Sequence, residues 1–438
     1  MKVGYIYSNG LLKFNFHAEE NSGKAKMARK TCKFYLPADW TLKSVHPDLL
    51  ALATILIVYP FCGSKITLPF GVSQLFHNTF RQITKKIVYP INNDLKPRIS
   101  PKLSKPALAY SGGVDSTAAL TLLPQNTQLF FLDRIIPHDM PQNSRYNKQS
   151  AHFACHSLRK LGKSVHLIKS DFEYVRNPVG FPIDVACAIP GLLLADYLRL
   201  DSMAFGTVME SAYRVGHLEY KDYSETHHYN TWGKLFQIVD MPFNQVVAGI
   251  SEVGTSKIVL NSPYKALAQS CIRGNLNNPC LNCNKCFRKQ LLNSTLSGKT
   301  LNDKFLSRLF LIPEAGKYIS KLPIKHENVL TYITAHYQGN FHIMKLLKKK
   351  TRGDLLNVSW MEKWHSPSLL LLPEKYRDYV KNRILESLEV MTPQDEKNVK
   401  SWNLIKSSAS PKYKKYNEQF ITALNNHKKN KPRKNPGK

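Results

Sequence analysis

Residues 109–117 constrain the fold of this 438-residue chain more than any other segment. A short apolar run, residues 106–110, leads into the segment and is predicted to be a buried strand. Gly112 and Gly113 then allow a tight turn, and an apolar helix is expected over residues 118–123. A strand that turns through glycines into a helix directs free backbone N–H groups at one point. The positive end of the helix dipole favours an anion there, so the segment predicts a phosphate-binding loop.

The loop reads Ser-Gly-Gly-Val-Asp-Ser and lacks the lysine of the common G-x-x-x-x-G-K-[ST] nucleotide loop. It resembles instead the PP-loop of ATP pyrophosphatases, enzymes that split ATP into AMP and pyrophosphate. The resemblance implies that the loop holds the leaving pyrophosphate, and that Asp115 orients the loop or binds Mg²⁺ through water. It implies nucleotide binding by Tyr110, Ser111, Gly112, Gly113, Val114, Asp115, Ser116 and Thr117, with Ser111, Asp115 and Ser116 as catalytic residues. The alternative is an ordinary glycine turn before a helix capped by Asp115 or Ser116.

Four of the eight cysteines form a second pattern, with the spacing Cys271-x8-Cys280-x2-Cys283-x2-Cys286. Four thiolates at such spacing are typical of a tetrahedral, structural zinc site. The remaining cysteines are isolated along the chain, and we expect buried thiols at Cys32, Cys62, Cys155 and Cys187. Disulfides are the alternative interpretation. The sequence shows no signal-peptide pattern, so we expect a reducing, cytoplasmic environment that favours zinc.

Together the two patterns resemble the 7-cyano-7-deazaguanine synthase branch of the PP-loop enzymes, over about residues 103–295. The second half of that family's pattern, Ser-Cys-x8-Cys-x2-Cys-x2-Cys-x-Arg, begins here at Ser270 and ends at Arg288. The resemblance implies an α/β fold of the HUP-like type, with a parallel sheet covered by helices on both faces. It implies ATP, Mg²⁺ and Zn²⁺ as cofactors. The implied reaction is adenylation of a carboxylate-type acceptor, after which a nitrogen nucleophile displaces AMP.

Apolar runs alternate with helical stretches after the loop, which favours a parallel sheet with ligands at the carboxyl ends of its strands. We predict strands at residues 128–132, 164–169, 203–206 and 235–239, and helices at 142–161 and 192–200. In the related synthases the strand end that corresponds to the end of the strand at 128–132 holds the adenosine. The resemblance therefore implies nucleotide contacts from Phe131, Leu132 and Asp133. The phosphates also need a cation, for which the candidates are Arg134, Lys169, Lys265 and Arg273.

The segments that hold the deazapurine in the related synthases differ in this chain. Residues 132–135 read Leu-Asp-Arg-Ile where the family has a Tyr-Gly-Gln-type segment, and residues 206–211 lack its Gly-x-Asn-x-x-Asp pattern. We therefore expect a different acceptor, either a small molecule or a protein tail. Glu210, His217 and the pair His227-His228 are candidate acceptor contacts, and exposed loop positions are the alternative for all four.

Both flanks of this region are long. Residues 1–100 are predicted to form an accessory α+β domain, with strands at 3–7, 11–16 and 32–36 and a helix from His46 to Val58. A linker rich in Asn, Lys, Pro and Ser follows at residues 92–105. Residues 296–426 are expected to be helical, and residues 427–438 to be a disordered basic tail.

The chain carries 62 Lys and Arg side chains against 31 Asp and Glu, a formal net charge of +31. Such an excess favours polyanions, so nucleic acid is a candidate partner. The longest apolar run, before Pro60, is too short to cross a bilayer, and no membrane association is expected. Three hypotheses remain: an AMP-forming ligase or synthase, an RNA-modifying PP-loop enzyme, and a non-catalytic nucleotide-binding protein. The sequence leaves the oligomeric state open.

Overall fold

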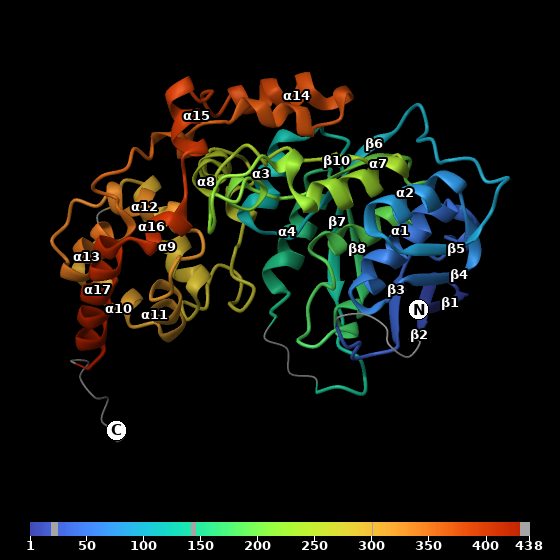
Figure 1. Cartoon of the computed structure of the whole chain (residues 1–438), viewed down its shortest axis with the longest axis horizontal. Coiled ribbons are helices and arrows are strands. Elements are labelled where there is room, and N and C mark those ends of the chain that lie inside the picture. Colours follow the sequence, from blue (N-terminus) through green and yellow to red (C-terminus); the bar gives the residue numbers. More distant parts are fainter. Residues whose placement is uncertain (19–24, 142–145, 300, 430–438) are drawn as a thin grey trace.

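The computed structural model describes residues 1–18, 25–141, 146–299 and 301–429, and one large sheet organises them (Figure 1). This sheet has ten strands in the order β10-β9-β6-β7-β8-β3-β2-β1-β4-β5. The strands are β1 Lys2–Ser8, β2 Leu11–His17, β3 Thr31–Tyr35, β4 Lys65–Val72, β5 Ile87–Ile91, β6 Lys105–Ala109, β7 Gln128–Arg134, β8 Ser164–Ser170, β9 Leu200–Ala204 and β10 Phe243–Asn244.

Parallel pairing dominates this sheet. Neighbouring strands from β10 through β9, β6 and β7 to β8 all run parallel, as do β1, β4 and β5. Antiparallel pairs join β8 to β3, β3 to β2 and β2 to β1. The predicted α/β class is confirmed, because the strands predicted after the loop at 128–132, 164–169 and 203–206 are β7, β8 and β9.

Residues 1–100 extend this sheet rather than form one of their own. Strand β3 lies beside β8, with Phe34 opposite Ser170, and the Phe34 ring stacks on Phe172 at 5.5 Å. The three predicted amino-terminal strands are β1, β2 and β3, and the predicted helix is α1, Pro47–Val58. In the connecting segment, residues 92–105, the buried Arg98 forms an ion pair with Asp196 at 2.7 Å.

Helices cover both faces of the sheet, because successive side chains of a strand point to opposite faces. Ala107 and Phe130 pack with α1 and α5, whereas Leu108 and Leu129 pack with α3, α4 and α8. The helices before residue 270 are α2 Gln74–Thr84, α3 Val114–Leu122, α4 Gln149–Lys160, α5 Ile189–Leu193, α6 Met209–Ala212, α7 Lys234–Ile238 and α8 Glu252–Leu260.

Two predicted elements differ from the structure. The predicted strand at 235–239 is wrong, because these residues form most of α7; a short apolar run fits a buried helix as well as a strand. The predicted helix at 192–200 is wrong over most of its length, because α5 ends at Leu193 and β9 begins at Leu200. Of the helix predicted at 142–161, residues 142–145 lie outside the described residues, and α4 begins at Gln149.

The chain beyond the sheet is helical, as predicted, and most of it lies on the left in Figure 1. Helix α14 returns across the molecule to pack against α3. The helices are α9 Asn284–Leu296, α10 Asp303–Phe310, α11 Pro313–Ile319, α12 Glu327–Ala335, α13 His342–Thr351, α14 Glu374–Leu385, α15 Pro393–Lys400, α16 Leu404–Ala409 and α17 Pro411–Lys429. Residues 430–438 of the predicted tail lie outside the described residues, and 427–429 end α17. Within the described ranges, no helix has both the length and the apolarity to traverse a membrane.

Candidate functional site

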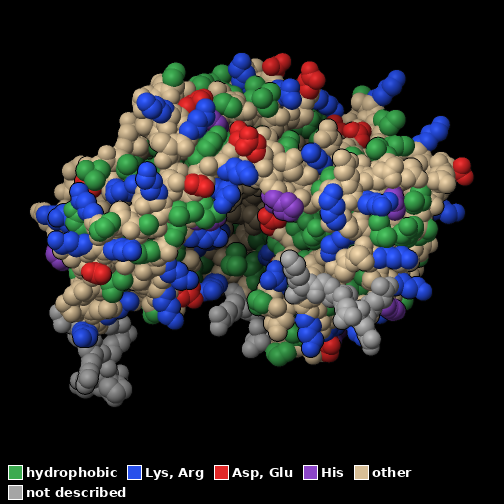
Figure 2. All heavy atoms as spheres, viewed as in Figure 1, with side chains coloured by type: hydrophobic (Ala, Val, Ile, Leu, Met, Phe, Trp, Pro, Cys, Tyr) green, Lys and Arg blue, Asp and Glu red, His purple; other side chains and the backbone are tan. Residues whose placement is uncertain are grey.

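A cavity of about 530 Å³ opens at the carboxyl ends of β6, β7 and β9. Its lining includes residues of the predicted phosphate loop, of the ends of β7 and β9, and some of those in the segments 181–187 and 211–228. Figure 2 shows the surface hollowed near its middle, between the half that carries the sheet and the C-terminal helices, with Lys and Arg side chains along the rim. Ligands of open α/β sheets bind at this end of the strands.

The phosphate loop leaves the N-terminus of α3 open. Gly112 has a φ of +75°, a conformation that favours glycine, and Gly113 is the N-cap residue with no side chain bonded to the first helical N–H groups. The Ser111 and Ser116 hydroxyls lie 3.0 Å apart, and Ser116 Oγ accepts the Ser111 N–H at 3.2 Å. Neither Asp115 nor Ser116 caps the helix, so the alternative of a side-chain-capped turn is wrong. The free N–H groups suit an anion.

Most residues predicted to bind the nucleotide line this cavity: Tyr110, Ser111, Gly113, Val114, Asp115, Ser116, Phe131 and Leu132. Gly112, Thr117 and Asp133 are not among the lining residues. The Thr117 hydroxyl donates to the Gly113 carbonyl at 2.8 Å, which tightens the first turn of α3. Asp133 is buried and pairs with Lys148 Nζ at 2.6 Å and His152 Nε2 at 3.2 Å, both on the side of α4.

Gly206, just after β9, lets the loop lie against the neighbouring strand end. A Cβ atom at this position would stand 2.8 Å from Ser116 N and 3.0 Å from the Asp115 carbonyl carbon. Both are backbone atoms, which cannot move aside as a flexible side chain can. Only glycine therefore fits at position 206, where the chain after β9 packs against the backbone of the phosphate loop.

Of the four predicted phosphate-binding cations, Arg134 alone lines this cavity. It forms an ion pair with Glu173 and lies over the rings of Tyr146 and Phe181, at 4.7 and 5.3 Å from their centroids. The side chains of Lys169 and Lys265 are elsewhere, and Arg273 pairs with Glu314 at 2.8 Å.

Sequence reasoning missed two cations that do line the cavity, Arg214 and Lys285. Neither forms an ion pair within the part of the chain that the structure describes. Lys285 stands between Cys283 and Cys286, and this position in the sequence relates it to the cysteines and not to the phosphate loop. Arg214 has a φ of +65°, which is uncommon for a residue with a side chain and is found at binding sites.

At another part of the cavity, a carboxylate, an imidazole and a phenol form a hydrogen-bonded chain. His228 Nε2 lies 3.1 Å from Asp184 Oδ2, and His228 Nδ1 lies 3.0 Å from the Tyr223 hydroxyl. The Asp184 side chain is largely exposed, so the cavity wall desolvates it only in part, and the hydrogen bond and charge of His228 hold its pKa below the ordinary value. His228 lines the cavity and its predicted companion His227 does not.

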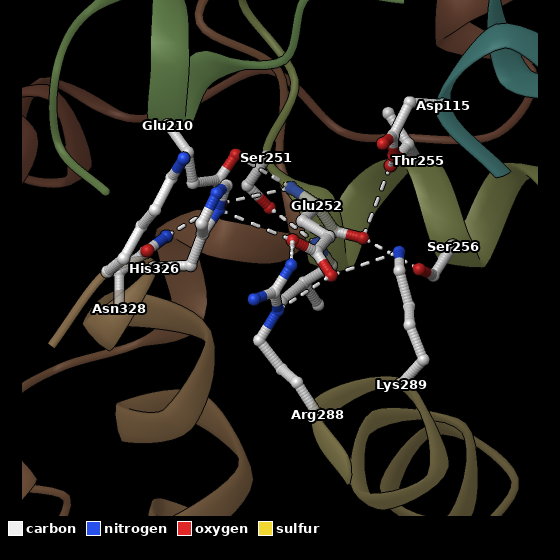
Figure 3. A network of polar contacts seen from close by, with 12 residues as sticks. Asp115, Glu210, Ser251, Glu252, Thr255, Ser256, Arg288, Lys289, His326 and Asn328 are labelled. Atoms are coloured by element: carbon white, nitrogen blue, oxygen red, sulfur yellow. Dashed lines mark hydrogen bonds and ion pairs between the residues drawn. The ribbon is translucent and has the colours of Figure 1, made fainter. Parts of the chain in front are cut away.

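The other two candidate acceptor contacts, Glu210 and His217, do not line the cavity. Glu210 is fully buried, so the alternative of an exposed loop position is wrong for this residue. Both of its carboxylate oxygens lie 3.0 Å from the Glu252 N–H, and Asn328 donates to it at 2.7 Å (Figure 3). Burial, and then the charge of Glu252, raise the pKa of Glu210 to about 7. Glu210 thus belongs to a buried network that supports α8.

The spaced cysteines come together beside the cavity. The Sγ atoms of Cys271, Cys280 and Cys286 all lie within 4.8 Å of one another and could hold a metal ion. Cys283 Sγ stands outside that group but packs in the same cluster, and it caps α9 by accepting the Cys286 N–H at 3.4 Å. Burial would raise the pKa of Cys271, but backbone N–H groups bonded to its sulfur lower it to about 7. All eight cysteines are free, which argues against the disulfide alternative.

We expect purified protein to contain about one zinc ion per chain, because a tetrahedral set of thiolates binds Zn²⁺ tightly. Replacement of Cys286 by serine should remove the metal, since it deletes one of the three sulfurs that lie together. Plasma emission spectrometry of the two proteins measures this. Cys155→Ser, which changes a buried thiol outside the cluster, is the control and should keep the metal. Iron in place of zinc, or metal retained by Cys286→Ser, would contradict the assignment.

Comparison with known proteins adds one finding. Residues 231–403 match the model of a family of unknown function, DUF6395. The matched range contains α8, the cysteine cluster and α9, but not the phosphate loop. No curated protein and no solved structure matches the chain. The fold and the site therefore define a mixed α/β protein with a cavity at its strand ends and a cysteine cluster that could hold a metal.

Proposed function

We propose that this chain is an ATP-dependent, AMP- and pyrophosphate-forming ligase or synthase of the PP-loop type, a divergent relative of the 7-cyano-7-deazaguanine synthases. The observation that carries the proposal is the uncapped N-terminus of α3, which opens through Ser111 and two glycines into a cavity that also holds Lys285. Backbone N–H groups, two hydroxyls and an ammonium group that has no ion pair among the described residues are a suitable set of partners for the pyrophosphate part of ATP.

In this proposal the residues act by position and charge. An oxygen of the acceptor carboxylate attacks the α-phosphorus of ATP, and the bond from that phosphorus to the bridging oxygen of pyrophosphate breaks. The loop N–H groups and Lys285 stabilise the charge that the leaving pyrophosphate gains. The aromatic and apolar residues at the end of β7, with Arg134 beside them, form the side of the cavity assigned to adenosine.

The side chains at two places suit metal ions, Mg²⁺ at the phosphate loop and Zn²⁺ at the cysteine cluster. Asp115 lines the cavity and would help to hold Mg²⁺, which supplies charge neutralisation for the phosphates. The cysteine cluster would hold Zn²⁺ in a structural role, because Cys283, which packs with the three sulfurs that lie together, would fill the fourth position of the tetrahedron.

The acceptor is assigned to the part of the cavity that holds Arg214, Asp184 and His228. The Arg214 guanidinium, which has no ion pair within the described ranges, is a suitable partner for the carboxylate that is to be adenylated. An RNA-modifying enzyme is the second candidate, and the observation that favours it is the net charge of +31.

Calorimetry with MgATP on metal-loaded protein tests the proposal. Wild-type protein should bind, and Ser111→Ala and Lys285→Met should each weaken binding by about tenfold or more, since a hydrogen bond or ion pair to a phosphate contributes about 1.5–3 kcal/mol. Lys265→Met is the matched control, because Lys265 does not line this cavity. Absence of binding by the wild type would refute the proposed function.

Exchange of labelled pyrophosphate into ATP then separates the candidates. Exchange that depends on a small carboxylate or a peptide supports a ligase or synthase, whereas exchange that depends on added RNA supports the second candidate. Nucleotide binding without exchange under either condition would indicate a non-catalytic nucleotide-binding protein.

A further inference from the structure

We infer that Thr255 and Glu252, both on α8, are positioning residues for Asp115 in the phosphate loop, and that the cysteine-bearing helix α9 holds them in place. The inference rests on the proposed nucleotide function and adds to it two residues outside the cavity. Neither residue lines the cavity, so neither can touch the nucleotide directly. Their effect must pass through Asp115, which does line it.

The first contact is between α8 and the loop. The Thr255 hydroxyl is fully buried and lies 2.9 Å from Asp115 Oδ1, which is closer than its other acceptor, the Glu252 carbonyl at 3.2 Å, so its proton is assigned to Asp115 (Figure 3). Asp115 Oδ2 has no hydrogen bond within the described part of the chain. One oxygen of the carboxylate is thus fixed by the protein, and the other is left for a magnesium ion or its water. A carboxylate held in this way loses less rotamer freedom when it binds an ion.

The second contact anchors α8 itself. Glu252 is the first residue of α8 and is buried, and its carboxylate accepts hydrogen bonds from Arg288 Nε at 3.1 Å and Nη2 at 3.0 Å. Lys289 Nζ lies 3.0 Å from Glu252 Oε1, the oxygen that also accepts from Arg288 Nε. Arg288 and Lys289 follow Cys286 closely on α9, so the charges that fix α8 come from the helix that begins in the cysteine cluster (Figure 3).

The cysteine segment also touches the loop directly. The backbone N–H of Gln269, just before Cys271, donates to the Gly112 carbonyl at 2.9 Å. The Gln269 side chain in turn bonds to the Asn275 carbonyl at 2.9 Å and to the Asn277 N–H at 3.0 Å, within the cysteine segment. Both ends of this segment therefore act on the phosphate loop, one through Gln269 and one through α9, Glu252 and Thr255.

The test is the magnesium dependence of ATP affinity, measured by calorimetry at a series of MgCl₂ concentrations and in EDTA. Thr255→Val keeps the shape of the side chain and removes the hydroxyl. We expect it to weaken MgATP binding by about tenfold, the effect of losing one hydrogen bond to a charged group, and to leave the affinity for metal-free ATP unchanged. Thr255→Ser should restore magnesium-dependent binding, because the hydroxyl returns.

Ser256→Ala is the matched control. Ser256 is the next residue on α8 and is also buried, and its hydroxyl donates to the Glu252 carbonyl of its own helix at 2.7 Å and not to Asp115. It should bind MgATP as the wild type does. If Thr255→Val binds MgATP as tightly as the wild type, the inference fails while the proposed function stands. An equal loss with and without magnesium would also overturn it, because Thr255 would then only support packing. A wild type that binds no ATP refutes the proposed function and the inference together.

Discussion

Replacement of Glu252 by glutamine is expected to lower the free energy of unfolding by about 3–5 kcal/mol, the usual result of removing one partner from a buried ion pair. The Glu252 carboxylate is only 2% exposed and is the sole acid that the Arg288 and Lys289 side chains pair with in the described residues. Glutamine keeps the shape but leaves two buried cations without a countercharge. Urea denaturation followed by circular dichroism measures the change.

A matched control is Glu386→Gln, just after the end of α14, where the pair with Arg383 is exposed to solvent. Exposed pairs contribute about 0–1 kcal/mol, so this variant should unfold close to the wild-type midpoint. Equal midpoints for Glu252→Gln and the wild type would contradict the role given to the buried network. Because Glu252 holds α8 and so Thr255 in place, Glu252→Gln should also weaken MgATP binding, and this is measured only under conditions where the variant is folded.

Replacement of Gly206 by alanine is expected to weaken MgATP binding by about tenfold to a hundredfold while the protein remains folded. The added Cβ would meet the backbone of Asp115 and Ser116 at 3.0 Å or less, so the first turn of α3 must shift. Forcing an extra carbon into a packed site costs about 1–3 kcal/mol, and here the strain falls on the groups that hold the phosphates. Calorimetry with MgATP measures the affinity, and the melting temperature reports the fold.

Gly4→Ala is the corresponding control, because a Cβ at Gly4 would have no atom within 4 Å. This variant should bind MgATP with wild-type affinity. Tight binding by Gly206→Ala would show that the loop can move without loss of the ligand, and would count against phosphate binding at the N-terminus of α3.

The local sequence pattern was sufficient to predict the strands that support the phosphate loop. The apolar run before Ser111 and the run at 128–132 are short and bounded by turn residues, and both are strands in the structure. The run at 235–239 is also short and apolar, but it lies in a helix. Its Leu235 and Phe236 side chains pack in the core on one face of the sheet and are not part of a strand. The extension of the sheet by β3 could not be predicted, since pairing of β3 with β8 joins residues far apart in the sequence.

In the candidate site, too, the residues that belong to local sequence patterns could be predicted, and those brought in by distant parts of the chain could not. Ser111, Asp115 and the cysteine spacing are local patterns, and the structure brings their residues to one cavity and one cluster. Lys285 and Arg214 reach that cavity only through the fold, so their spacing in the sequence gives no signal. Glu210 looked like a loop residue because nothing near it in the sequence indicates that Asn328 and Glu252 enclose it.

The pairing of β3 with β8 limits how far this chain can be truncated. A fragment of residues 103–295 would retain the phosphate loop and all four spaced cysteines. It would, however, leave β8 as an unpaired edge strand and remove the Phe34 ring that stacks on Phe172. Unprotected strand edges recruit strands from other molecules, so such a fragment would aggregate. Shortened versions intended for crystallisation or binding assays should therefore keep the first hundred residues, although no predicted ligand contact lies among them.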